Sequence, residues 1–73
     1  MAEQERAIEV GDRFEDRDKR NPGRVVQVRL VTDGGEPRAK VQTEVHPTNP
    51  EVVGRHSWIR LATLRRRFTR LSH

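Results

Sequence analysis

The chain has 73 residues, 36% of them charged and 32% apolar, and a formal net charge of +4, so it is long enough for one domain with a small core. It has no cysteine, which excludes disulfides and thiolate metal sites, and no apolar stretch approaches the ~20 residues of a membrane-spanning helix. Residues 1–6 are polar and unlike a signal peptide, so we expect a soluble, cytoplasmic protein.

The first residues are expected to lie outside the folded part of the chain. Residues 1–8 are mostly polar and predict a flexible leader, which is followed by a single domain at residues 9–73. The domain opens at Val10-Gly11-Asp12-Arg13-Phe14, where Gly-Asp favours a turn and Phe14 is the first large apolar residue. A polar loop follows and ends in Asn21-Pro22-Gly23, a strong turn signal.

Two alternating segments predict a pair of antiparallel strands joined by a hairpin. In residues 24–31, one face carries Val26, Val28 and Leu30. In residues 38–45, one face carries Ala39, Val41, Thr43 and Val45. Because Asp33-Gly34-Gly35 lies between them and favours a hairpin, we expect the two strands to pair.

The C-terminal third predicts one more strand and then allows two structures. Residues 55–61 alternate, with Ser57, Ile59 and Leu61 on one face and His56, Trp58 and Arg60 on the other. After them, Leu61, Leu64, Phe68 and Leu71 have the spacing of an amphipathic helix. The same residues fit a helical turn at 61–65 followed by a strand at 67–71, and periodicity does not decide between the two.

Three short segments resemble the small SH3-like β-barrels, a group that includes KOW and Tudor-like modules. These are residues 10–14, residues 22–26 (Pro-Gly-Arg-Val-Val) and residues 54–59 (Gly-Arg-His-Ser-Trp-Ile) with Leu61 and Leu64 after them. The chain is similar in particular to short proteins of actinobacteria and their phages, over roughly residues 9–71. The resemblance implies an all-β fold, a five-stranded barrel with a 3-10 turn before the last strand. The alternative is a β-meander followed by a C-terminal amphipathic helix.

Positive charge is concentrated at the C-terminal end. Residues 55–73 hold six arginines and no acid, whereas residues 1–23 hold seven acids against five bases. Nucleic acid phosphate is the commonest partner of such a cluster, and a solvated face that balances the acidic first third is the alternative. The predicted phosphate contacts are Arg55, Arg60, Arg65, Arg66, Arg67 and Arg70.

Trp58 is the one tryptophan of the chain and completes the predicted site. On the polar face of its strand it would be a stacking platform for a base. If the strand register slips by one residue, Trp58 joins the core instead. The sequence therefore predicts a non-enzymatic nucleic-acid-binding module, for DNA or RNA. The alternative is a protein-interaction or self-associating module, such as a homodimer, whose arginine face docks an acidic surface or whose strand edge accepts a partner strand.

The sequence predicts neither metal binding nor catalysis. The spacings of His46, His56 and His73 match no metal-ligand pattern. Ser57 and Ser72, the two serines, lie in no recognisable nucleophile motif. We expect no catalytic residue, no metal ion and no cofactor.

Overall fold

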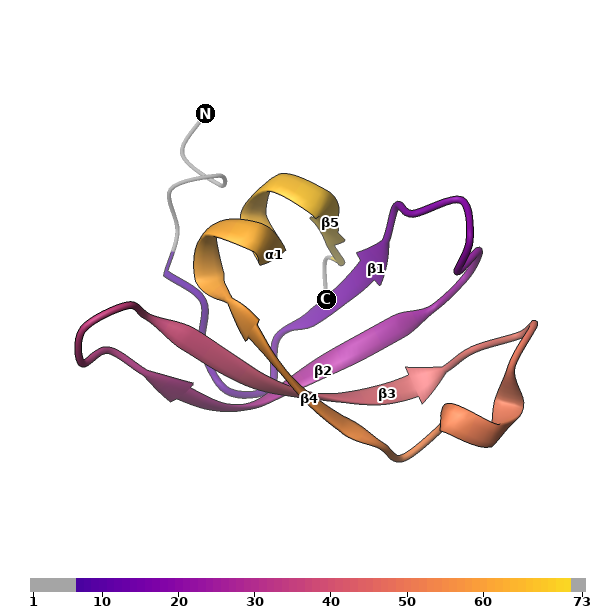
Figure 1. Ribbon diagram of the computed structural model, residues 1–73, viewed down its shortest axis with the longest axis horizontal. Coiled ribbons are helices and arrows are strands. Elements are labelled where there is room, and N and C mark those ends of the chain that lie inside the picture. The colour runs from indigo at the N-terminus through magenta and orange to yellow at the C-terminus, as the bar shows by residue number, and fades with distance from the viewer. Residues whose placement is uncertain (1–6, 72–73) are drawn as a thin grey trace.

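Five antiparallel strands form one sheet in the order β4-β3-β2-β1-β5 in the computed structural model, which describes residues 7–71 (Figure 1). The strands are β1 (Arg13–Asp16), β2 (Val25–Thr32), β3 (Arg38–Val45), β4 (His56–Arg60) and β5 (Phe68–Arg70). A helix, α1 (Leu61–Arg67), joins β4 to β5, and a 3-10 turn, η2 (Pro50–Val52), lies between β3 and β4.

The predicted set of five strands is confirmed, and two finer details differ. Among the described residues no strand pairing joins β4 to β5, so the sheet does not close into a barrel. The 3-10 turn predicted before the last strand is a seven-residue α-helix. Its residue Leu64 and the C-cap residue Phe68, four positions later, are both buried in the core, which is the spacing of one helical face. Within residues 7–71 no helix is long and apolar enough to cross a membrane.

A bulge in β2 reverses its alternation. Val26 and Val28 are buried as predicted, but Leu30 is 47% exposed and Val31 packs against the core instead. The register explains the change, since Val28 lies opposite Val41 whereas Leu30 lies opposite Lys40. One extra residue in β2 therefore moves every later side chain to the other face.

A second irregularity has the same effect near the end of β3. Thr43 lies opposite Val26, whereas Val45 lies opposite Val25, so Glu44 is the extra residue. Val45, which the alternation placed in the core, is 43% exposed. The next residue, His46, is buried in its place.

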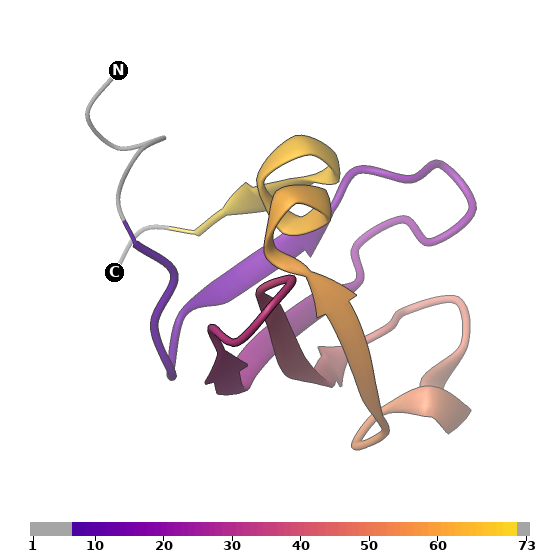
Figure 2. The same ribbon diagram turned by 60° about the vertical axis from the view of Figure 1, so that its left-hand side comes forward.

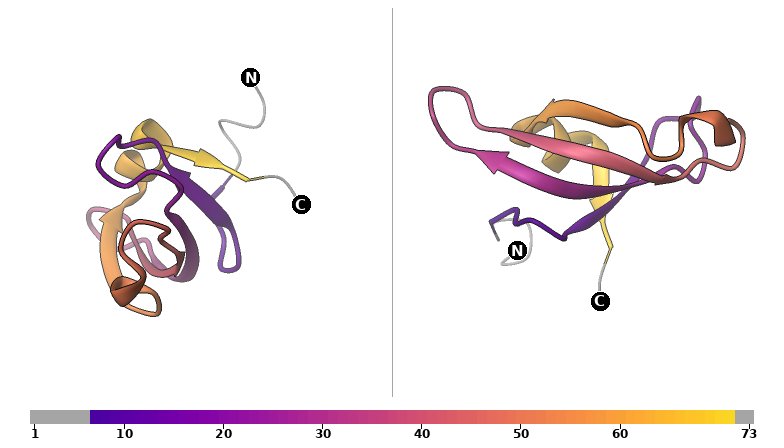
Figure 3. Two further views of the ribbon diagram at one scale, coloured as in Figure 1. Left: turned by 90° about the vertical axis from the view of Figure 1, so that its right-hand side faces the viewer. Right: turned by 90° about the horizontal axis from the view of Figure 1, so that it is seen from below.

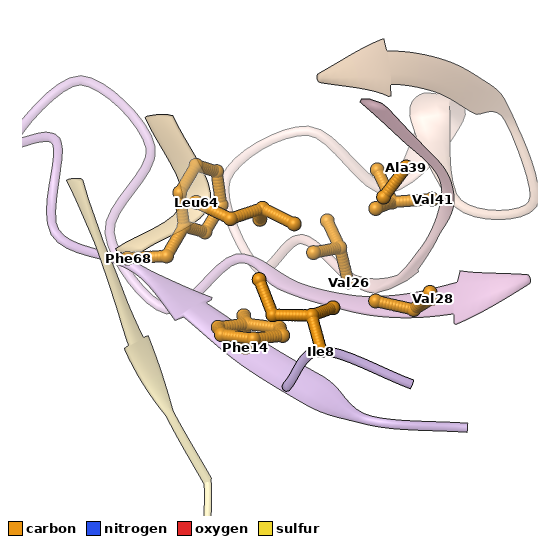
Figure 4. Packing of buried hydrophobic residues seen from close by; sticks show 8 residues of the cluster. All are labelled: Ile8, Phe14, Val26, Val28, Ala39, Val41, Leu64 and Phe68. Carbon is orange, nitrogen blue, oxygen red and sulfur yellow. The ribbon is translucent and has the colours of Figure 1, made fainter. Parts of the chain in front are cut away.

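The core lies between α1 and the face of the sheet that the helix covers. In Figure 4 the side chains of Leu64 and Phe68 point toward those that rise from β1, β2 and β3. The buried apolar residues are Ile8, Phe14, Val26, Val28, Ala39, Val41, Leu64 and Phe68. Ile8 belongs to the predicted leader, so packing begins within that segment, while residues 1–6 of the leader lie outside the described residues.

The helix covers one face of the sheet and leaves the other face open. Figure 2 shows α1 above the end of β4, where the chain turns back toward β1 and β5. From below, β2, β3 and β4 run side by side with α1 behind them (Figure 3, right). Side chains that alternate with the core residues of these strands are therefore directed away from α1.

Candidate nucleic-acid interface

Arg70 is part of the folded framework. Its Nη1 donates to Asp12 Oδ2 at 2.7 Å, and its Nη2 donates to the carbonyl of Ala7 at 3.3 Å. The guanidinium also lies 5.3 Å from the centre of the Phe14 ring, a cation–π distance. With only 16% of its side chain exposed, Arg70 joins β5 to the segment before β1 and is poorly placed to contact a ligand.

Arg60 and Arg67 form ion pairs that remain open to exchange. Arg60 Nε lies 3.2 Å from Glu36 Oε2, and Arg67 Nη2 lies 3.9 Å from Asp18 Oδ2. Both arginine side chains are more than half exposed. Because both guanidinium groups are open to solvent and such pairs contribute little to stability, a phosphate can compete with either carboxylate.

Three more of the predicted arginines are exposed and form no ion pair within residues 7–71, namely Arg55, Arg65 and Arg66. They do not form one face. Arg55 precedes β4, about 17 Å from Arg60 at the usual rise of a strand. On α1, successive residues are rotated by about 100°, so Arg65 and Arg66 point in different directions from Arg67. The six arginines are therefore distributed over β4 and the residue before it, α1 and β5.

Trp58 lies on the outward face of β4, where the alternation predicted it. Its side chain is 51% exposed, whereas Ile59 packs against the core. Ile59 lies opposite the buried Ala39, and Trp58 lies opposite Lys40. The register slip that would bury Trp58 does not occur. The strand thus presents an aromatic surface at the edge of the sheet.

Strand pairing places further cations beside Trp58. In the register of β3 with β4, Arg38 lies opposite Arg60 and Lys40 lies opposite Trp58. Leu30 of β2 lies opposite Lys40 on its other side. We name this surface the outer patch, and it consists of Leu30, Arg38, Lys40, Trp58 and Arg60.

Sequence reasoning missed Arg38 and Lys40 as site residues. Their alternation placed both on the outward face of their strand, which the structure confirms. The missing information was the register of β3 against β4. The residues between these strands include prolines and the turn η2, and a loop of this kind does not reveal which residues become neighbours.

A groove lies on the other side of the β4 edge. Its volume is about 470 Å³, and the β1–β2 loop faces β4 and α1 across it. On the helix, Thr63 and Arg67 line it, since residues four apart share one side. Four arginines and two aspartates among the lining residues give it a net charge of +2. The lining residues are Asp16, Asp18, Arg20, Asn21, Arg24, Trp58, Ile59, Arg60, Thr63, Arg67 and Phe68.

A buried polar network fixes the shape of the β1–β2 loop. Asp16 Oδ2 accepts from Arg24 Nη1 at 3.3 Å and from Asn21 Nδ2 at 3.4 Å, and Asp16 Oδ1 accepts from the backbone N–H of Asp18 at 2.8 Å. His46 Nε2 lies 3.2 Å from Asn21 Oδ1. These partners compensate the burial of Asp16 and His46, so His46 supports the wall of the groove.

Asp18 holds two of the arginines that line the groove. Its Oδ2 lies 2.8 Å from Arg20 Nη2 and 3.9 Å from Arg67 Nη2. The hydrogen bonds from the Arg20 side chain and then from the Arg20 backbone N–H lower the pKa of Asp18 to about 2. The same pair raises the pKa of Arg20. At neutral pH Asp18 is therefore ionised and competes with any anion for these two guanidinium groups.

The backbone of β4 is open on the side that faces away from β3. At the ends of the pairing, the N–H of Thr43 donates to the Arg55 carbonyl at 2.9 Å, and the N–H of Leu61 donates to the Pro37 carbonyl at 3.1 Å. Backbone groups of an antiparallel strand point alternately to its two sides. The N–H and C=O groups of His56, Trp58 and Arg60 therefore point away from β3 and have no strand partner among residues 7–71.

The part of the chain that the structure describes contains no group of three or more histidine, cysteine or acidic residues placed to hold a metal ion. His73 lies outside that part. Comparison of the chain with models of protein families, with curated proteins and with solved structures found no match.

Proposed function

We propose that this protein binds nucleic acid at the edge formed by β4, with Trp58 stacking on a base and the surrounding cations contacting phosphate. The observation that carries the proposal is the position of a half-exposed Trp58 between the outer patch and the groove. The proposed contacts are Arg38, Lys40, Trp58, Arg60 and Arg67.

The chemistry of these side chains favours a nucleic acid. Aromatic rings stack on any base, and Arg and Lys contact the backbone without reading sequence. Arg60 pairs with the exposed Glu36, and the exposed Arg67 reaches Asp18 at 3.9 Å, so a phosphate can compete with either carboxylate. Binding is therefore expected to tolerate changes of sequence and to accept DNA and RNA. Arg55, Arg65 and Arg66 contribute to the general attraction, and Arg70 does not.

The proposal extends to fold family and location. The order of five strands with a helical turn before the last one supports membership of the SH3-like group that the sequence resembles. Its sheet is more open than a barrel. We place the protein in the cytoplasm as a non-enzymatic module.

Fluorescence anisotropy with short labelled DNA and RNA of mixed sequence tests the function. We expect binding at low salt that weakens as salt rises, because each phosphate contact releases counterions. Trp58→Ala should lower the affinity about 5- to 150-fold, the equivalent of ~1–3 kcal/mol for one stacked base, whereas Trp58→Phe should retain most of it. Lack of binding at low salt, or an affinity that ignores both salt and Trp58, would contradict the proposal.

A protein partner is the second candidate function, and the open β4 edge is the observation that favours it. The outward backbone groups of His56 and Trp58, which have no strand partner among residues 7–71, could pair with a strand from an acidic protein or from a second copy of this chain. Light scattering of the purified protein distinguishes the two functions. A mass above that of the monomer, together with no oligonucleotide binding, would favour the protein partner.

A further inference from the structure

We infer that the ligand is a single strand which crosses the β4 edge, from the outer patch into the groove, with one unpaired base on Trp58 and phosphates bound on both sides of it. This inference rests on the proposed function and adds the class of nucleic acid and its path.

Cations lie on both sides of Trp58. On the sheet face, Lys40 is its direct neighbour across the strand pair, and Arg38 is next to Arg60. On the groove side, Arg20 of the β1–β2 loop and Arg67 of α1 line the groove together with Trp58. A duplex lying on the outer patch would leave the groove cations unused. A strand that passes over Trp58 contacts both sets, since the tryptophan borders both surfaces.

No strand of residues 7–71 pairs with the outer edge of β4, which leaves room for such a crossing. Its outward N–H groups at Trp58 and Arg60 belong to the residues that line the groove. Backbone N–H groups are common donors to phosphate oxygens. The path thus combines two kinds of donor, guanidinium or ammonium groups on either side and backbone N–H groups at the edge between them.

Duplex geometry does not match this arrangement. Bases in a duplex are paired and stacked on each other, so one must be unpaired and extruded before it can stack on Trp58. The groove has a volume of about 470 Å³, within the range of ~300–1,000 Å³ that holds small organic ligands, and is large enough for one nucleotide. A single strand offers an accessible base with flanking phosphates and no such opening step.

The experiment compares a single-stranded DNA of mixed sequence with the duplex of the same sequence, through Trp58 fluorescence and anisotropy. We expect the single strand to quench the fluorescence and to bind on the order of tenfold tighter at equal salt. Lys40→Ala and Arg67→Ala should each reduce the slope of log affinity against log salt by about 0.7, the value for one lost phosphate contact on a single strand.

Two matched controls separate position from charge. Arg65→Ala removes the same charge from the same helix on a different side, and Lys19→Ala removes a lysine that lines neither surface. Each should reduce the slope by much less than Lys40→Ala or Arg67→Ala does. Arg67→Gln and Lys40→Gln repeat the test with longer side chains, and thermal unfolding by circular dichroism verifies that each variant is folded.

Each outcome is decisive. Equal affinity and equal quenching for single strand and duplex would overturn the inference and leave the proposed function standing. If only one of Lys40→Ala and Arg67→Ala reduces the slope of log affinity against log salt, the ligand contacts only one side of β4, and the crossing path is overturned. Absence of binding by either nucleic acid would remove the proposed function together with the inference.

Discussion

Asp18 is the residue through which the chain neutralises part of its own positive charge. It pairs with Arg20 in its own loop and reaches Arg67 on α1. These two contacts connect the walls of the groove. They also occupy guanidinium groups that the proposed ligand needs. A carboxylate at this position therefore shapes the groove and lowers its attraction for anions.

The ionisation of Asp18 gives a prediction about pH. Its pKa is lowered to about 2 from the ordinary 3.8, so the carboxylate is charged more readily in the folded chain than in the unfolded one. The stabilisation that results is fully present above pH 3.8 and is lost as the pH falls through about 2. An NMR titration of the Asp18 side-chain carboxyl carbon should show this midpoint, and a midpoint near 3.8 would mean that the Arg20 hydrogen bonds do not persist in solution.

Asp18→Asn should strengthen nucleic acid binding. The amide oxygen can still accept the backbone N–H of Arg20, while the negative charge between Arg20 and Arg67 is removed. We expect a gain of about 1.5- to 5-fold at low salt, the small effect that is typical of a charge pair near the surface. Glu51→Gln, which removes the same charge from η2, is the control for anisotropy and should give a smaller gain. An unchanged or weaker affinity for Asp18→Asn would show that Asp18 does not compete with the ligand.

At the scale of elements, a contact between two loops holds the β1–β2 loop, part of which lines the groove, against the β3–β4 loop. Gly23 in the β1–β2 loop has φ +80°, and a Cβ at this position would lie 3.0 Å from Pro47 Cγ in the β3–β4 loop. A positive φ strains every residue with a side chain, and here the added atom would also meet the proline ring. Only glycine satisfies both conditions.

Gly23→Ala should lower the free energy of unfolding by at least about 1–2 kcal/mol, the cost of a left-handed conformation for an L-residue. Gly34→Ala is the matched control, because no atom lies within 4 Å of its added Cβ and its φ is not positive. Urea unfolding followed by circular dichroism measures both variants. Equal stability of the two would show that the contact between Gly23 and Pro47 is absent in solution.

The strands show what alternation can and cannot predict. Period-two patterns located β3 at 38–45 and β2 within one residue. They failed after the bulges, where Leu30 and Val45 became exposed and Val31 and His46 turned inward. A bulge depends on how two strands pair, and neither strand carries a local signal for it.

At the scale of the whole molecule, a small core stabilises the fold. Leu64 is fully buried and links α1 to the sheet. Leu64→Ala should lower the free energy of unfolding by about 2–5 kcal/mol, a large part of the ~4–11 kcal/mol expected for a chain of this size. Thermal unfolding of Leu64→Ala beside Leu30→Ala tests this. Leu30 is half exposed, so Leu30→Ala should lower the free energy of unfolding much less. Similar losses of stability for the two variants would contradict the assignment of the core.

The candidate site could be predicted only in part. The sequence shows which side chains could bind an anion or stack on a base, but it does not show which of them lie side by side. The outward position of Trp58 and Arg60 followed from alternation alone. The roles of Arg70, which binds Asp12 far away in the sequence, and of Lys40, which lies beside Trp58, depend on contacts between distant segments. The run of arginines therefore predicted an anionic partner, which stays a prediction, and it did not identify which cations share a surface.

The most direct measurement of the central claim is an NMR titration of the ¹⁵N-labelled protein with a short single-stranded oligonucleotide at low salt. We predict that the largest shifts occur at the Trp58 indole N–H and at the backbone amides of Lys40, Arg60 and Arg67, while the amides of Arg65 and Val53 change little. The absence of shifts, or shifts centred on Arg55 and Arg65 with Trp58 unaffected, would contradict a binding site at the β4 edge.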